Sequence, residues 1–261
     1  MNASLSCPYP TVPVFVISMK REGNCLRPWF GSGKYISDFG NLFDGEHEFA
    51  KFQQILLQQD AKYAIPNPEV QTGILTEFLQ QKMDGRTPFG FIHISYDEIR
   101  QFSKNAGEAD SAELPVLVDW LAQNRYPVIH ILRNNALDCF IETTFANNQP
   151  ADDPALKLNV DESVREIRQM QIDVECFRNW LVGTNRVEFF VESIVREGRI
   201  SELVVHQICK HLELDARLID KTKTKEYSVK DDFQSCQIKS LLRPALIRAG
   251  YENLIQLPRA A

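Results

Sequence analysis

The sequence lacks an apolar segment long enough to cross a bilayer. Its longest apolar run, around Val12 to Met19, is far shorter than the roughly 20 residues that a membrane-spanning helix requires. The first 13 residues carry no basic flank and contain three prolines, which is not the pattern of a secretory signal peptide. We therefore expect a cytoplasmic protein that does not act on a membrane.

The sequence also has no excess of basic charge and no cysteine pattern of a metal site. Its 29 basic and 35 acidic residues give a net charge of −6, which argues against a nucleic-acid partner bound through counterion release. The six cysteines are scattered, with neither a CxxC pair nor the cysteine–histidine spacing of a zinc site. We expect reduced thiols, several of them buried, and no metal ion.

Short apolar strands alternate with helices along the chain, and this order predicts an α/β fold. Runs typical of strands are Val14–Ile17, Phe89–Tyr96, Val128–Leu132 and Arg186–Glu192. Helical spacing marks residues 26–30, 48–59, 70–82, 114–124, 138–145, 161–181, 200–212 and 233–249, while 98–107 reads as a surface helix or a loop. The prediction is a P-loop-like three-layer fold, with a mainly parallel central sheet flanked by helices in one domain over residues 1–261.

The first strand leads into a basic turn that contains a glycine. Lys20 and Arg21 follow the apolar run, and the backbone N–H groups of Gly23, Asn24 and Cys25 come next. Loops at the carboxyl end of a first strand are where α/β folds bind phosphate, so this turn is a candidate anion cradle. A solvated basic turn without a ligand is the alternative.

A second cation follows a strand near the middle of the chain. Arg133 comes directly after the strand at residues 128–132. A cation in this position is costly unless an anion meets it, so we expect Arg133 to hold an anionic ligand. The alternative is a structural ion pair with Asp138 or Glu142.

These motifs together resemble those of sulfotransferases that use 3′-phosphoadenosine 5′-phosphosulfate (PAPS), and their small bacterial, trehalose-sulfotransferase-like branch in particular. The family's [KR]-S-G-T/S-T/S-L loop matches Arg21–Leu26, and its vIhLxR strand with the following N-x-L-D matches residues 128–138. Softer matches are FGFIHISYDEI at Phe89–Ile99 and the strand and helix at Val187–Leu214. The four matches span residues 14–214 in the family's order.

The resemblance implies which residues hold PAPS. The 5′-phosphosulfate would lie on Lys20 and the loop Arg21, Glu22, Gly23, Asn24, Cys25 and Leu26. Arg133 would hold the 3′-phosphate, with Thr143 standing in for a family serine that falls on Glu142. Lys223 and Lys225 lie where the family closes over the nucleotide; a solvated loop is their alternative.

The resemblance also suggests catalytic groups. Glu48 is the proposed base, because the bacterial branch carries an EF element after the donor loop, and His47 is the neighbour that could serve instead. An exposed turn and helix cap is the alternative for both. Arg21 would neutralise the leaving oxygen, and His93 would bind the sulfonate from within the sheet or serve as a core histidine. His130 reads as structural.

The predicted activity is transfer of a sulfonate group from PAPS to a hydroxyl or amine of a small molecule, such as a sugar or another natural product of secondary metabolism. Adenosine 3′,5′-bisphosphate is the second product. Glu22 in place of the loop serine, and the missing second serine, favour the alternative of a catalytically impaired nucleotide-binding or partner protein. A divergent small-molecule kinase is a third possibility, although Pro28 and Tyr35 break the GxxxxGK[ST] pattern around Gly31–Lys34.

Overall fold

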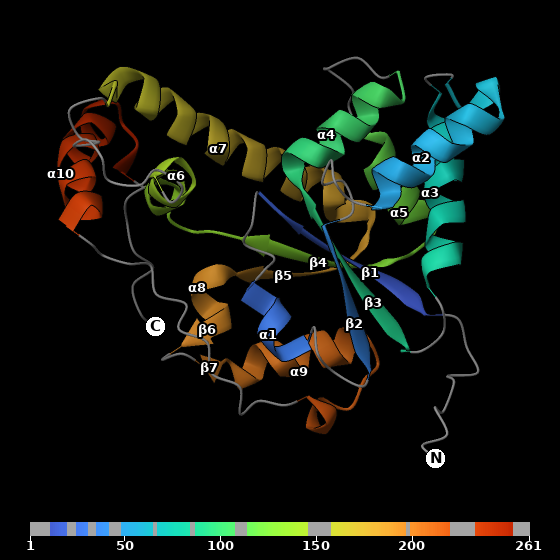
Figure 1. Cartoon of the computed structure of the whole chain (residues 1–261). Coiled ribbons are helices and arrows are strands. Elements are labelled where there is room, and N and C mark those ends of the chain that lie inside the picture. Colours follow the sequence, from blue (N-terminus) through green and yellow to red (C-terminus); the bar gives the residue numbers. More distant parts are fainter. Residues whose placement is uncertain are drawn as a thin grey trace.

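A five-stranded sheet forms the centre of the structure, and helices cover both of its faces (Figure 1). In this computed structural model the strand order is β2-β3-β1-β4-β5, and every neighbouring pair is parallel. This confirms the prediction of an α/β fold with a parallel central sheet flanked by helices. The structure describes residues 11–19, 25–30, 35–41, 48–64, 67–83, 87–107, 114–145, 158–196, 199–219 and 233–252.

The sheet strands are β1 (Val12–Ser18), β2 (Ile36–Asn41), β3 (Phe89–Ser95), β4 (Pro127–Leu132) and β5 (Asn185–Phe190). The helices are α1 (Arg27–Phe30), α2 (Glu48–Gln59), α3 (Pro68–Lys82), α4 (Tyr96–Asn105), α5 (Val116–Gln123), α6 (Ala136–Phe145), α7 (Val160–Trp180), α8 (Val191–Ile194), α9 (Glu202–His211) and α10 (Phe233–Arg248). A separate antiparallel pair consists of β6 (Val195–Arg196) and β7 (Arg199–Ile200).

Strand β1 lies in the middle of the sheet because its side chains are apolar on both faces. Phe15 and Ile17 pack into the core under α2, α3, α4 and α5, whereas Val14 and Val16 pack into the core against α1 and α9. All four side chains have no exposed surface. Burying each stabilises the fold by about 1.5–3 kcal/mol, which explains why this strand is enclosed between two neighbours.

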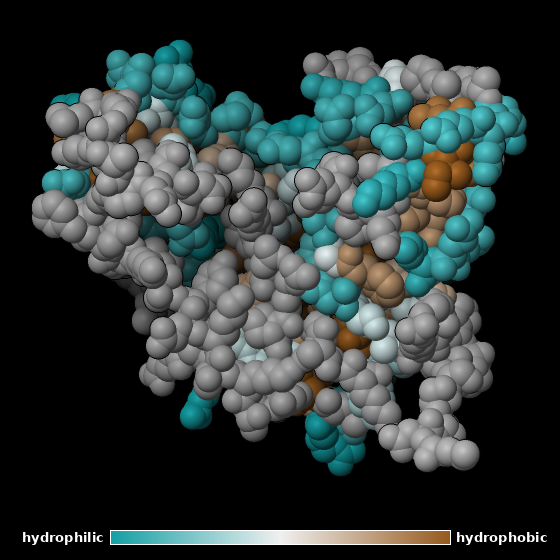
Figure 2. Space-filling model, viewed as in Figure 1, coloured by the Kyte–Doolittle hydropathy of each residue, from teal (hydrophilic) through white to brown (hydrophobic). Residues whose placement is uncertain are grey.

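A third apolar cluster joins α6, α10 and the first half of α7. Its buried members include Phe140 of α6, Ile167 of α7 and Leu242 of α10. The second half of α7 instead packs Phe177 into the core beneath α4, so this long helix connects two clusters. Figure 2 shows a notch in the upper outline of the molecule, between the first half of α7 on the left and α4 on the right.

Within the central sheet, two strand assignments differ from the sequence prediction, and the short pair β6 and β7 was not predicted either. Strand β2 was not expected, because its sequence ISDFGN has no alternating apolar pattern and its register with β3 is irregular between Asp38 and Asn41. As an edge strand it needs only one buried side chain, Ile36, to be positioned. The strand expected to reach Glu192 ends at Phe190, since Glu192 lies in the first turn of α8.

Other sequence expectations agree with the described part of the chain. Segment 98–107 belongs to a helix, α4, which begins with a capping box between Ser95 and Glu98. The described thiols of Cys25, Cys139, Cys176 and Cys209 form no disulfide, and all but the third are buried. Among the described helices none is long and apolar enough to cross a membrane.

Gly90 of β3 provides a test of the unexpected strand β2. A Cβ atom at Gly90 would approach Cε2 of Phe39 in β2 to 2.5 Å and the sulfur of Met83 to 2.9 Å. We expect Gly90→Ala to lower the free energy of unfolding by about 1–3 kcal/mol, the usual cost of overpacking. Urea unfolding measures this effect.

Gly73→Ala is the matched control. Gly73 lies inside α3, and nothing stands within 4 Å of the added Cβ. This change should raise stability by up to about 1 kcal/mol through helix propensity. If both variants behave alike, β2 does not pack on β3 as described.

Candidate functional site

The carboxyl ends of β1, β3 and β4 lie together at one edge of the sheet. Ser18, the last residue of β1, pairs with Ser95 of β3 and with Ile131 of β4. The chain continues from β1 to β2 on one side of the sheet and from β4 to β5 on the other. Such a reversal opens a crevice between two neighbouring strands, and α/β proteins bind ligands there.

A direct contact joins the end of β1 to the helix that follows β4. The thiol of Cys139 in α6 donates to the sulfur of Met19 at 3.7 Å, and both residues are buried. Met19 immediately precedes the candidate cradle loop, while α6 follows Arg133. The ends of β1 and β4, after which the two cationic segments follow in the sequence, therefore lie at the same edge of the sheet.

The Asn135–Asp138 motif has a local structural role at the start of α6. The side-chain oxygen of Asn135 accepts from the backbone N–H of Asp138 at 3.1 Å, the arrangement of a helix N-cap. In return, the Asn135 amide donates to the Asp138 carboxylate at 2.7 Å. Lys239 of α10 contacts the other oxygen of this carboxylate at 3.0 Å, which ties α10 to α6.

Arg133 lies almost fully buried after β4, and its side chain is 4% exposed. Its Nη1 stands 2.7 Å from Oε2 of Glu142 in α6. The approach is not that of a well-aligned hydrogen bond, so the contact is best described as an ion pair. The sequence offered Asp138 and Glu142 as structural partners of Arg133. In the structure Glu142 pairs with Arg133, whereas Asp138 pairs with Lys239. The role of Arg133 as a ligand for phosphate stays a prediction.

A second carboxylate meets the residue after Arg133. The backbone N–H of Asn134 donates to both oxygens of Glu192, at 3.2 and 3.4 Å. Glu192 comes from α8, directly after β5. Two acidic side chains from two different helices therefore contact donors of the segment that follows β4.

His93 lies within the sheet, beside Val16 of β1 and Asn41 of β2. It is 7% exposed, and its Nε2 is 3.3 Å from a carboxylate oxygen of Asp38. Its Nδ1 makes no hydrogen bond within the described part of the chain. Asp38 was not singled out in the sequence, because nothing in the spacing of β2 marks it. Binding of a sulfonate by His93 stays a prediction.

The other predicted site residues are only partly described. Cys25 and Leu26 are buried in the core against α9, and Glu48 is the first residue of α2 and Thr143 part of α6. The side chains of Glu48 and Thr143 are outside the described set. Also outside the described residues are Lys20, Arg21, Glu22, Gly23, Asn24, His47, Lys223 and Lys225.

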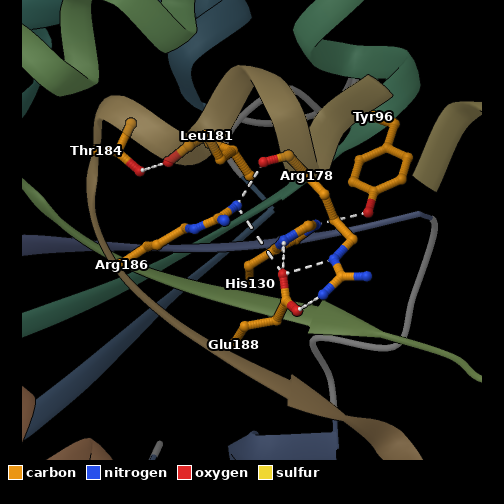
Figure 3. A network of polar contacts seen from close by, with 7 residues as sticks. All are labelled: Tyr96, His130, Arg178, Leu181, Thr184, Arg186 and Glu188. Carbon is orange, nitrogen blue, oxygen red and sulfur yellow. Dashed lines mark hydrogen bonds and ion pairs between the residues drawn. The ribbon is translucent and has the colours of Figure 1, made fainter. Parts of the chain in front are cut away.

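A polar network surrounds the buried His130 of β4 (Figure 3). The Tyr96 hydroxyl lies 2.6 Å from Nε2 of His130, and Nδ1 of His130 lies 3.3 Å from Oε2 of Glu188. His130 has no exposed surface. Because no solvent reaches the ring, the network supports the structural interpretation of His130 and connects α4 to β4 and β5.

Two arginines complete this network. Arg178 of α7 donates to both oxygens of Glu188, at 3.2 and 2.6 Å, and Nη1 of Arg186 lies 3.9 Å from Oε2 of Glu188. Arg186 also donates to the backbone carbonyl of Arg178 at 2.7 Å (Figure 3). No pattern in the sequence marks this arrangement, since its members are spread over residues 96–188 and come together only in the folded sheet and its covering helices.

The charges of the network follow from burial and pairing. Burial lowers the pKa of His130, an effect that the neighbouring Glu188 only partly offsets. The pKa of Glu188 is lowered to about 2, chiefly by His130 and then by Arg178. We therefore assign a neutral imidazole that points Nδ1–H at the Glu188 carboxylate, with Nε2 accepting from the Tyr96 hydroxyl.

Comparison with family models finds no match to this chain, and comparison with curated protein sequences finds no significant relative.

Tyr96→Phe tests the hydroxyl of the network without disturbing its ring. The ring stacks on Phe177 with centroids 3.9 Å apart and planes at 5°, a contact that phenylalanine keeps. The variant removes the donor that faces the buried Nε2 of His130, so we expect a loss of about 1–3 kcal/mol in thermal or urea unfolding.

Tyr126→Phe serves as its control. Tyr126 packs against Phe15, and its hydroxyl makes no hydrogen bond that involves the described residues. Stability should stay within about 0.5 kcal/mol of the wild type. An equal loss in both variants would contradict the special role of the Tyr96 hydroxyl.

Glu188→Gln tests the charge of the network through its pH dependence. The folded pKa of Glu188 lies below its ordinary value of 4.5, so its stabilisation is present above that pH and is lost as the pH falls toward about 2. We expect the variant to be about 1–2 kcal/mol less stable at pH 7, because the side chain is still 20% exposed and solvent weakens the pairing. In urea unfolding between pH 7 and pH 3, the free energies of unfolding of the wild type and of Glu188→Gln should approach each other as the pH falls. Glu166→Gln, at an exposed position of α7, should change stability little at any pH.

Proposed function

We propose that this protein is a sulfotransferase, which moves a sulfonate group from PAPS to a hydroxyl or amine of a small-molecule acceptor. The observation that supports this most is the position of Arg133. A buried guanidinium follows β4 at the sheet edge where β1 ends, and Cys139 of its helix touches Met19. A nucleotide with phosphates at both ends of its ribose needs two cationic points at such an edge, and the cradle loop and Arg133 are the candidates.

The proposed reaction needs charge neutralisation and one base. The acceptor oxygen or nitrogen bonds to sulfur as the bond between sulfur and the bridging phosphate oxygen breaks, which leaves adenosine 3′,5′-bisphosphate. Lys20 and Arg21 would stabilise the negative charge on the leaving oxygen. The acceptor proton would pass to Glu48, or to His47 beside it. His93 would hold the sulfonate oxygens, and the protein's main contribution is orientation.

The finer features of the proposal concern the acceptor and the setting. We propose an acceptor from secondary metabolism, a natural product or a sugar, and action in the cytoplasm. Neither Thr143 nor the lysines Lys223 and Lys225 is needed for the reaction itself. Their proposed role is to bind the adenosine bisphosphate portion of PAPS.

The ion pair between Arg133 and Glu142 favours a second candidate function. At 2.7 Å the carboxylate stands where a phosphate oxygen would have to contact this guanidinium. A protein that binds nucleotide weakly, or a partner protein without turnover, would tolerate such an arrangement. This candidate shares the fold but predicts no transfer of labelled sulfonate.

Titration calorimetry separates these functions. The sulfotransferase should bind adenosine 3′,5′-bisphosphate in the micromolar range and prefer it to ATP with Mg²⁺. Incubation with PAPS labelled in its sulfonate group and a metabolite extract should then yield a labelled acceptor. Preference for ATP with Mg²⁺ would instead indicate a kinase, and absence of binding to either nucleotide would overturn the proposal.

Arg133→Lys tests the residue that carries the argument. Lysine keeps the charge but cannot present the paired N–H groups of a guanidinium, so affinity for the bisphosphate should fall by about tenfold. Arg100→Lys is the matched control, because Arg100 is also partly buried and pairs with Asp173 of α7. Its affinity should stay within about twofold of the wild type. Equal affinities for Arg133→Lys and the wild type would remove Arg133 from the site.

A further inference from the structure

Two acidic side chains meet the donors that an anion would use after β4. Glu142 of α6 contacts the guanidinium of Arg133, and Glu192 of α8 accepts from the backbone N–H of Asn134. These carboxylates come from helices that are separate in the sequence and converge on two consecutive residues. The guanidinium of Arg133 and the backbone N–H of Asn134 are therefore engaged by carboxylates of the chain itself.

If a phosphate or sulfonate binds Arg133 while Glu142 stays in place, the repulsion between the two anions costs free energy. Two anions within contact distance of one guanidinium repel each other, and low solvent exposure strengthens the repulsion. Either the carboxylate leaves or the ligand binds weakly. The Arg133–Glu142 contact is thus in competition with any dianion at this point.

The exposures of the two partners decide which side chain moves. The Arg133 side chain is 4% exposed and directly follows a buried strand, whereas that of Glu142 is 35% exposed. A carboxylate with access to water recovers its hydration when it leaves, but the guanidinium would have to cross packed core. Glu142 is therefore the side chain that can be displaced.

We propose that Glu142 determines the affinity and selectivity of this anion site, as an internal counter-ion that a ligand must displace from Arg133. The proposal rests on the proposed function in treating Arg133 as an anion ligand. It adds the residue that sets how strongly the anion binds. A monoanion cannot compensate for the lost ion pair as well as a dianion can, so Glu142 favours doubly charged phosphate or sulfate groups.

Calorimetry with adenosine 3′,5′-bisphosphate tests this role in Glu142→Gln. The amide keeps the size of the side chain and removes its charge, so we expect binding at least about tenfold tighter than in the wild type. Asp138→Asn is the matched control, since it removes the same charge one turn earlier on α6 from a carboxylate that pairs with Lys239. Its affinity should change by less than about threefold. If the wild type binds and Glu142→Gln binds no tighter, the proposal fails while the proposed function stands.

Inorganic sulfate provides a readout that does not depend on the nucleotide. Loss of the Glu142 charge beside the buried Arg133 should lower the melting temperature of Glu142→Gln. Sulfate should raise the melting temperature of this variant more than that of the wild type or of Asp138→Asn. Equal sulfate shifts in the three proteins would overturn the proposal. Absence of bisphosphate binding in all of them would reject the proposed nucleotide, and the sulfate series alone would then decide the role of Glu142. Glu142→Ala is the second variant if the glutamine does not fold.

Discussion

The charge of Arg133 is the constraint on which the candidate site, at the sheet edge where β1 and β4 end, depends. A guanidinium does not lose its proton in a protein, so a side chain that is 4% exposed must have an anion beside it. Glu142 supplies this anion from α6, and α6 is in turn held by its Asn135 cap, by Lys239 of α10 and by the contact of Cys139 with Met19. The helix after β4 is therefore anchored to the sheet edge through polar contacts as well as apolar packing.

Within β4 itself, a second set of polar contacts fixes the strand from within the core. His130 is fully buried, and a buried imidazole must satisfy both ring nitrogens. Its Nε2 lies 2.6 Å from the hydroxyl of Tyr96, the first residue of α4, and its Nδ1 lies 3.3 Å from Glu188 in β5. Arg178 brings α7 to the same carboxylate. Since α7 also packs into two apolar clusters, this network sets the position of the long helix relative to the sheet.

Much of the secondary structure could be predicted from the sequence, because buried helix and strand faces require apolar residues at regular spacings. Helix α2 covers the predicted residues 48–59, and the strands β1, β3 and β4 overlap the predicted, largely apolar runs. Strand β2 was not predicted because an edge strand of mixed polarity has no run of apolar residues that would mark it. The predicted end of β5 was wrong because Val191 and Glu192 continue the strand-like run of residues. In the structure Glu192 lies in the first turn of α8 and accepts a hydrogen bond from the backbone N–H of Asn134.

For the candidate site, the sequence alone determined that basic residues follow two buried strands and that a helix comes shortly after Arg133, since both features depend on neighbours within a few residues. Only the tertiary structure decided that β1 lies between β3 and β4, and that the ends of β1 and β4 share one edge. It also decided that Glu142 rather than Asp138 pairs with Arg133, and that Tyr96 and Glu188 meet His130. The physical reason is that these contacts depend on strand register and on how α6 and α10 are placed, which local sequence does not encode. Lys239 and Asp138, for example, are far apart along the chain, and their contact leaves Glu142 as the partner of Arg133.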